Sequence, residues 1–182
     1  MEIIKTKLEG VLILKTSLYE DSRGFFMESY NESIFQKFNI NYKFVQDNHS
    51  LSVSKDVIRG LHYQIGPKAQ TKLIRVIAGS IFDVVVDIRK TSVTYGNWVG
   101  TILSKENKQQ LLVPKGFAHG FCTLEPNTEV LYKVDEFYSP EHDFGITWDD
   151  PMIGIDWPTS TPLLSERDKK HPLLKDAVVY TD

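Results

Sequence analysis

From residue 42 onward, the chain is a succession of short β-strand patterns separated by brief polar, glycine or proline turns. The predicted strands cover residues 44–48, 50–54, 58–64, 71–78, 80–89, 98–103, 109–113, 120–123 and 128–137. Parallel strands need long crossover connections, and these short intervals leave no room for them. The pattern therefore predicts an all-β protein built as an antiparallel sandwich or barrel.

The N-terminal part adds fewer strands and one helix. Residues 8–19 form an apolar, β-rich run that ends in a polar turn at 20–24, which predicts a strand followed by a turn. Residues 25–30 then resume an extended pattern. Residues 31–38 have the spacing of a short helix, and Asn31 stands where it can cap the first turn.

The tail after residue 140 is less regular, because prolines interrupt its periodicity. Residues 163–170 predict one further short helix, with Ser165 as its cap. No repeat, heptad or flexible linker divides the sequence, so residues 1–182 are expected to form a single domain. Such a tail is expected to wrap around the sandwich or around a neighbouring subunit.

Composition narrows the possible partners. With 182 residues, 41% of them hydrophobic, the chain can bury a substantial core. A net charge of −3 gives no general electrostatic reason to bind nucleic acid. We see neither the apolar run of a signal peptide nor a segment of about 20 apolar residues, so we expect neither secretion nor membrane insertion. The lone Cys122 excludes an intramolecular disulfide and cysteine-rich zinc sites. We therefore expect a cytoplasmic protein without nucleic-acid or membrane partners.

His62 is the first candidate for chemistry, within the sequence Arg59-Gly60-Leu61-His62-Tyr63-Gln64. A partly buried imidazole with an acidic partner can remove a proton near neutral pH, which makes His62 a candidate general base. The alternative is a hydrogen-bonded histidine of the core. Period-two alternation places His62 on the same strand face as Gly60 and Gln64.

Two other strand patterns add a lysine and two tyrosines. In the strand starting at Lys72, this lysine shares a face with Ile74, and along residues 130–138 the side chains of Tyr132 and Tyr138 are cofacial. The two tyrosines could therefore project into a common barrel mouth. Each of these side chains alone could equally be structural, so their conjunction with a histidine carries the functional argument.

The stretch of residues 112–121 resembles the second motif of the cupin jelly rolls, in which Pro, Gly and His recur at this spacing. A tight turn there would aim His119 inward. Metal-binding cupins also need a first motif with two alternating histidines and a glutamate. The corresponding strand here offers only His62, followed by Tyr63 and Gln64. On this ligand count we expect no metal.

Several segments together resemble the dTDP-4-dehydrorhamnose 3,5-epimerase family over nearly the whole chain. They occur in the family's order and spacing and are Asp21–Gly24, Gln46–Ser50, Arg59–His62, Lys72 with the run to Asp87–Arg89, Val113–Phe121, Tyr132–Tyr138 and Gly154–Pro158. The resemblance implies a cupin-type antiparallel jelly roll, or double-stranded β-helix, with a few short helices. It also implies a homodimer with exchanged N-terminal segments.

The implied reaction is epimerisation at C3 and C5 of dTDP-4-keto-6-deoxy-D-glucose, giving dTDP-4-keto-L-rhamnose without a cofactor. The resemblance makes His62 the base that removes a proton next to the 4-keto group. Asp168 would pair with that imidazole, fix its tautomer and stabilise the imidazolium. Lys72 would stabilise the enolate oxygen. Tyr132 would return a proton from the opposite face, as inversion requires.

The resemblance also implies a set of residues that bind the nucleotide sugar. These are Arg23, Glu28, Gln46, Asp47, Asn48, Arg59, His119, Tyr138, Asp143 and Arg167. Arginines suit the diphosphate, and Tyr138 suits stacking on the base. Strand alternation, however, puts Arg59 on the face away from His62 unless Gly60 allows a bulge.

Two positions depart from the family pattern, which often has Lys in place of Arg167 and Glu in place of Asp143. Both changes keep the charge but alter the reach of the side chain. Three other functions stay open at this point: a 3- or 5-mono-epimerase of a related nucleotide sugar, a metal-dependent cupin oxygenase and a non-catalytic sugar-binding jelly roll. Stopping after one inversion would depend on side-chain placement around the same His-Asp pair.

Overall fold

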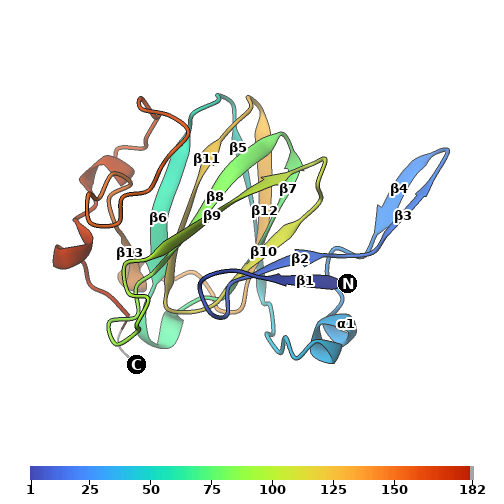
Figure 1. Ribbon diagram of the computed structural model, residues 1–182, viewed down its shortest axis with the longest axis horizontal. Coiled ribbons are helices and arrows are strands. Elements are labelled where there is room, and N and C mark those ends of the chain that lie inside the picture. The colour runs from blue at the N-terminus through green and yellow to red at the C-terminus, as the bar shows by residue number, and fades with distance from the viewer. Residues whose placement is uncertain (181–182) are drawn as a thin grey trace.

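The computed structural model describes residues 1–180 and places most of the strands in two antiparallel β-sheets that face each other (Figure 1). In spatial order, one sheet contains β1 (Glu2–Lys5), β2 (Leu12–Lys15), β10 (Gln110–Val113), β7 (Lys72–Ala78), β12 (Thr128–Val134) and β5 (Gln46–Ser52). The other contains β13 (Asp143–Gly145), β6 (Ile58–Gln64), β11 (Phe117–Thr123), β8 (Ser80–Asp87) and β9 (Trp98–Ser104). The expectation of an all-β jelly roll is confirmed.

The faces that the two sheets turn toward each other share one buried cluster. Ile74 and Val130 reach it from the six-stranded sheet, and Val85 and Phe117 reach it from the five-stranded sheet. These side chains come from alternate positions of their strands, as expected for a strand with one face in the core. The polar residues of the same strand faces are consequently held inside the sandwich or at its rim.

The outer faces are covered by other parts of the chain. The C-terminal tail covers the five-stranded sheet, where Leu174 and Trp157 pack with Val84 (Figure 1). On the six-stranded sheet, Phe35 from the short helix α1 (Glu32–Lys37) packs with Leu73. The tail therefore lies directly over β6 and its neighbours, as the sequence led us to expect.

A two-stranded hairpin, β3 (Leu18–Asp21) and β4 (Gly24–Met27), projects away from the sandwich (Figure 1). Its aromatic side chains are largely solvent-exposed, with Tyr19 and Phe26 each 64% exposed. The hairpin corrects the expectation of one strand over residues 8–19, since the run divides into β2 and β3. The strand β1 was not expected.

The short helices match the sequence expectations unequally. Helix α1 is confirmed with its cap, because Asn31 Oδ1 accepts from the Ile34 backbone N–H at 3.3 Å. The helix expected over residues 163–170 is wrong in extent: the structure has only the 3₁₀ turn η3 (Asp168–Lys170). Ser165 Oγ still accepts from the Asp168 N–H at 3.0 Å, so the capping interaction survives without the longer helix.

Three further 3₁₀ turns are present, namely η1 (Gly66–Lys68), η2 (Pro140–His142) and η4 (Leu174–Asp176). Two predicted strands at 44–48 and 50–54 form the single strand β5, and β12 ends at Val134, before the predicted end at residue 137. Within residues 1–180, no helix is long and apolar enough to cross a membrane.

A bulge in β6 changes which residues of that strand share a face. His62 lies opposite His119 on β11, whereas Arg59 lies opposite Phe121, so the register shifts between these pairs. Gly60 accommodates the shift with φ +132°, and a Cβ at this position would lie 2.6 Å from Gly120 Cα. Because paired residues of antiparallel strands share a face, the bulge brings Arg59 to the same face as His62.

Candidate active site

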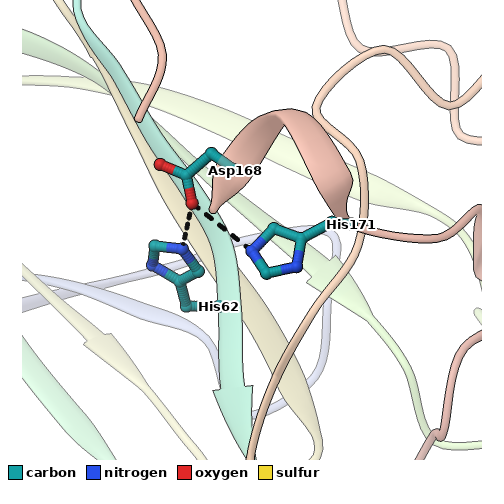
Figure 2. Close-up of side chains that lie close together, drawn as sticks. All are labelled: His62, Asp168 and His171. Carbon is teal, nitrogen blue, oxygen red and sulfur yellow. Dashed lines mark hydrogen bonds and ion pairs between the residues drawn. The ribbon is translucent and has the colours of Figure 1, made fainter. Parts of the chain in front are cut away.

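His62 and Asp168 form a short hydrogen bond between β6 and the tail (Figure 2). His62 Nε2 lies 2.6 Å from Asp168 Oδ1. The carboxylate is nearly inaccessible, with 4% of its side chain exposed, whereas 32% of the imidazole is exposed. Burial raises the pKa of Asp168, but the hydrogen bond from His62, with smaller contributions from Ser165 and His171, brings it below its ordinary value. Asp168 is thus an anion that orients the His62 ring through Nε2. The other ring nitrogen, Nδ1, is not used in this contact.

Lys72 approaches His62 from the facing sheet. Lys72 is the first residue of β7, and its Nζ donates to the backbone carbonyl of His62 at 3.2 Å. Burial lowers the pKa of Lys72 to about 8, against the opposing influence of the carboxylates of Asp143 and Asp83. Below that pH the side chain carries a positive charge next to the candidate base, where it can stabilise a developing oxyanion.

Tyr132 also belongs to the six-stranded sheet and packs against the shared core cluster. Burial raises the pKa of its hydroxyl, Asp143 raises it further, and Arg59 lowers it. The phenol is therefore protonated at neutral pH and can donate a proton. An acid on one sheet and a base on the other can act on a substrate held between them.

A second His-Asp pair lies beside the first. His119 Nε2 is 2.8 Å from Asp83 Oδ1, and both side chains are buried. His119 is the cross-strand partner of His62 on β11, and Asp83 lies opposite Phe121 on β8. Asp83 Oδ2 is buried with no hydrogen-bond partner among the described residues, so it can still accept a hydrogen bond from a ligand.

The rim of the site holds several predicted binding residues in mutual contact. On β5, Gln46 donates to Asn48 at 2.9 Å and accepts from the backbone N–H of Tyr138 at 3.1 Å. Tyr138 follows the end of β12 and is 54% exposed, which leaves its ring accessible for stacking. Because β12 ends at Val134, Tyr138 is not part of the strand that was expected to align it with Tyr132.

The two departures from the family pattern lie against each other. Arg167 Nη1 is 2.7 Å from Asp143 Oδ2, and Asp143 is the residue of β13 that pairs with Gln64 of β6. The shorter carboxylate and the longer guanidinium compensate for each other in reach. The predicted binding residue Arg59 donates to Ser52 Oγ at 3.1 Å, so it joins the edges of the two sheets.

Three predicted binding residues are not brought to this cluster within the described chain. Arg23 lies on the hairpin and pairs with Asp21 at 2.6 Å. Glu28 follows the hairpin, where it accepts from Asn31. Asp47 lies on the opposite face of β5 from its two neighbours in sequence and pairs with a lysine of β12 at 2.8 Å. Their binding roles stay predictions.

Sequence reasoning missed two residues of the site, Asp83 and His171. The signal for Asp83 was available, since it is an acid in the middle of an otherwise apolar strand. His171 had no comparable signal, because the fold of the tail alone brings it near Asp168. With His171 included, His62, Asp168 and His171 each offer one possible metal-ligand atom within 4.8 Å of the others. The expectation of a metal-free site stays a prediction.

Comparison with known proteins finds relatives that match nearly the whole chain. Residues 5–176 match the dTDP-4-dehydrorhamnose 3,5-epimerase family. The chain is 53% identical to the dTDP-4-dehydrorhamnose 3,5-epimerase of Shigella flexneri over 92% of its length and 93% of that protein.

Two crystal structures show the same fold at high similarity. The dTDP-4-dehydrorhamnose 3,5-epimerase of Bacillus anthracis, with TDP and pyrophosphate bound, superposes with a TM-score of 0.93 at 52% identity, covering 94% of this chain and 98% of the other. A dTDP-6-deoxy-D-glucose-3,5-epimerase of Legionella pneumophila in complex with dTDP-4-keto-L-rhamnose has a TM-score of 0.91 at 46% identity, covering 96% and 93%.

Proposed function

Because the chain belongs to the dTDP-4-dehydrorhamnose 3,5-epimerase family, we propose that it inverts C3 and C5 of dTDP-4-keto-6-deoxy-D-glucose with His62 as the base. The product is dTDP-4-keto-L-rhamnose, and the enzyme is an isomerase. The observation that carries the residue assignment is the 2.6 Å hydrogen bond between a partly exposed imidazole and a buried carboxylate. This arrangement leaves one ring nitrogen to take a proton and stabilises the resulting imidazolium.

The first half-reaction removes the proton from the carbon next to the 4-keto group. The C–H electron pair forms the enolate double bond, the carbonyl π electrons move to oxygen, and the proton goes to His62. Lys72 stabilises the enolate oxygen, because its ammonium is held by the His62 carbonyl close to the same imidazole. Asp168 keeps the imidazolium in place through the same hydrogen bond.

The second half-reaction delivers a proton to the opposite face of the carbon. Tyr132 is on the sheet that faces His62, and its raised pKa keeps the hydroxyl protonated until the enolate forms. After each inversion, His62 carries an extra proton and Tyr132 has lost one, so exchange with solvent resets both groups. The same pair can then act at the second carbon, since both carbons flank the 4-keto group.

Incubation of the enzyme with the 4-keto-6-deoxy nucleotide sugar in D2O tests the overall reaction. NMR should show deuterium at both C3 and C5 together with the doubly inverted product. Exchange confined to one carbon would assign the enzyme to the mono-epimerases of related sugars. Absence of any exchange, with dTDP still bound, would identify a non-catalytic sugar-binding protein.

We also propose a homodimer in which the hairpin of one chain completes the site of the other. The exposed aromatics of β3 and β4 support this proposal, because a projecting apolar arm is stabilised when a partner covers it. The arm projects away from β6, the strand that carries His62 (Figure 1). Arg23 lies in the turn between β3 and β4, at the tip of that arm. Within the dimer its guanidinium would meet the diphosphate of the partner's substrate.

Co-expression of two inactive chains tests this arrangement. If Arg23 acts in the partner's site, mixing Arg23→Ala chains with His62→Ala chains produces dimers with one intact site, and activity returns to about a quarter of the wild-type level. If both residues serve the same chain, no mixed dimer contains an intact site and activity stays absent. A cytoplasmic location is also proposed, and the single buried Cys122 is compatible with a reducing compartment.

A further inference from the structure

We propose that His171 is a positioning residue for the epimerase reaction, a second imidazole that holds the Asp168 carboxylate in place for His62. The proposal depends on the assignment of His62 and Asp168 made above. It adds a third member to the pair, supplied by the residue three positions after Asp168 in the tail.

The geometry around Asp168 Oδ1 carries the proposal. His62 Nε2 lies 2.6 Å from this oxygen and His171 Nε2 lies 3.3 Å from it, so two imidazoles converge on one carboxylate oxygen (Figure 2). The two rings meet edge to face, with centroids 5.4 Å apart and an interplanar angle of 75°. His171 Nε2 is buried without a well-aligned hydrogen bond to any described residue. A buried polar nitrogen aimed at a catalytic carboxylate calls for a functional explanation.

The surroundings of His171 are built to hold its ring. The side chain is 9% exposed, and a Cβ at Gly145 would lie 2.4 Å from Nε2 of the ring. Gly145 is also the cross-strand partner of His62, so the missing side chain opens the space beside the base. The next residue anchors the tail, since the Pro172 carbonyl accepts from the Thr147 N–H at 2.9 Å.

The charges around His171 favour its neutral form. Burial lowers the pKa of His171, the positive charge of His62 lowers it further, and Arg167 adds to the effect against the opposing charge of Asp168. These are the charged groups that face the ring from its own turn and from β6, while β13 presents Gly145. The positive charge needed during catalysis is therefore left to His62.

A neutral His171 can serve Asp168 as an N–H donor. With a proton on Nε2, it would stabilise the carboxylate as an anion and fix the oxygen that accepts from His62 Nε2. His62 is then held in the tautomer whose Nδ1 is free to accept the substrate proton. Removing the donor would leave the Asp168 carboxylate less stabilised and more basic, so the acid limb of the activity profile should move up.

A resident metal ion is the competing explanation for these three groups. The 3.3 Å between His171 Nε2 and Asp168 Oδ1 would fit two ligands of one ion, but the separation of His62 from Asp168 argues against it. Ligands of a tetrahedral zinc ion lie about 2.0–2.1 Å from the metal and therefore about 3.3 Å from one another. The 2.6 Å separation of His62 Nε2 and Asp168 Oδ1 is instead that of a charge-assisted hydrogen bond.

The test compares two substitutions that separate hydrogen bonding from packing. His171→Phe keeps the ring volume but removes the donor, and it should lower kcat about tenfold, leave KM nearly unchanged and raise the midpoint of the acid limb by about 0.5–1 pH unit. His171→Gln restores an N–H donor and should recover most of kcat and the wild-type acid limb. His49→Phe removes the imidazole of an exposed His-Glu pair between β5 and β12, and this control should leave kcat and the acid limb unchanged.

If folded His171→Phe has the kcat and the acid limb of the wild-type enzyme, and His171→Gln is the poorer variant, then His171 acts only by packing. Histidine ¹⁵N NMR of the wild-type enzyme gives a second measurement that needs no variant at this position. It should show the neutral Nε2–H tautomer for His171 at pH 7. A proton on Nδ1 alone would overturn the proposal even if the His171 variants failed to fold. Substrate deuterium exchange by the wild-type enzyme tests the epimerase assignment separately.

Discussion

Two His-Asp pairs lie on neighbouring strands of one sheet, and they differ in where the carboxylate comes from. His119 and Asp83 both belong to central strands of the five-stranded sheet and are both buried. His62 also belongs to a strand, but its partner Asp168 comes from a 3₁₀ turn of the tail that packs on β6. The tail-supported imidazole is 32% exposed, compared with 9% for His119.

The difference shows how the same pair of residues can serve two purposes. A carboxylate supplied by the tail orients His62 and leaves its ring partly accessible, so the ring can meet a substrate and exchange protons with solvent. In the second pair, both partners are fixed within the sheet, and Asp83 Oδ2 alone is left to accept a hydrogen bond. We therefore propose proton transfer for the pair with His62, and binding and structural roles for the pair with His119.

The largest expected effect separates the two carboxylates. Asp168→Asn removes the charge that stabilises the imidazolium and can select the wrong tautomer of His62, so kcat should fall by about 10²–10⁴-fold. Asp83→Asn should lower kcat by less than about tenfold, because His119 transfers no proton in this mechanism. Steady-state kinetics on both variants measures the contrast. A larger loss of kcat in Asp83→Asn would reverse the two assignments.

Stability should show the opposite order. His119→Ala leaves the fully buried Asp83 without its hydrogen-bond donor, so the free energy of unfolding should drop by about 3 kcal/mol or more. His62→Ala should cost less, because Asp168 keeps His171 nearby and water can enter the partly exposed position. Urea unfolding followed by circular dichroism gives both values. Equal losses would mean that the two pairs contribute alike to the fold.

A smaller effect is expected where the nucleotide binds, away from both pairs. Tyr138→Ala removes an exposed ring at the rim, and affinity for dTDP should weaken by about 1–3 kcal/mol, the scale for a base stacked on an aromatic side chain. Isothermal titration calorimetry with dTDP measures the change, and Tyr138→Phe should bind nearly as well as wild type. An unchanged Kd in Tyr138→Ala would remove this residue from the site.

The smallest expected effect is a pH dependence set by Lys72, whose Nζ donates to the backbone carbonyl of His62. Burial lowers its pKa to about 8, so its ammonium is present below that pH and is lost as the pH rises through it. The logarithm of kcat/KM should therefore decline above about pH 8, by about tenfold per pH unit. Lys72→Arg should abolish this decline, since guanidinium stays protonated. If the decline persists in an active Lys72→Arg enzyme, another group is responsible for it.

Much of the fold could be predicted from the sequence, because strand signals are local. The strand Ile58–Gln64 was predicted with its observed bounds, and the Asn31 cap of α1 was recognised from residue type and position. The three-residue strand β13 was not predicted, because so short a segment carries no periodicity and forms only by pairing with β6. The bulge at Gly60 was considered for Arg59, and the register confirms it.

The site could be predicted less completely, because its geometry depends on contacts between distant segments. Resemblance to the family pointed to His62 and Asp168, and the structure brings these two together from positions 106 residues apart. His171 reaches the same carboxylate only because the tail packs against β13 beside Gly145. Arg23 and Glu28 could be assigned to binding by resemblance alone, and their placement within one chain does not bring them to the His62 cluster.

Proton exchange by single-site variants tests the division of labour most directly. In D2O, folded His62→Ala enzyme should incorporate no deuterium at C3 or C5 of the 4-keto sugar, because the group that removes the proton is gone. Tyr132→Phe should form less product yet retain some exchange at C3, since His62 can still remove and return a proton on its own face. Exchange at a near wild-type rate in folded His62→Ala would contradict the assignment of the base. Loss of all exchange in Tyr132→Phe alone would require the two roles to be reversed.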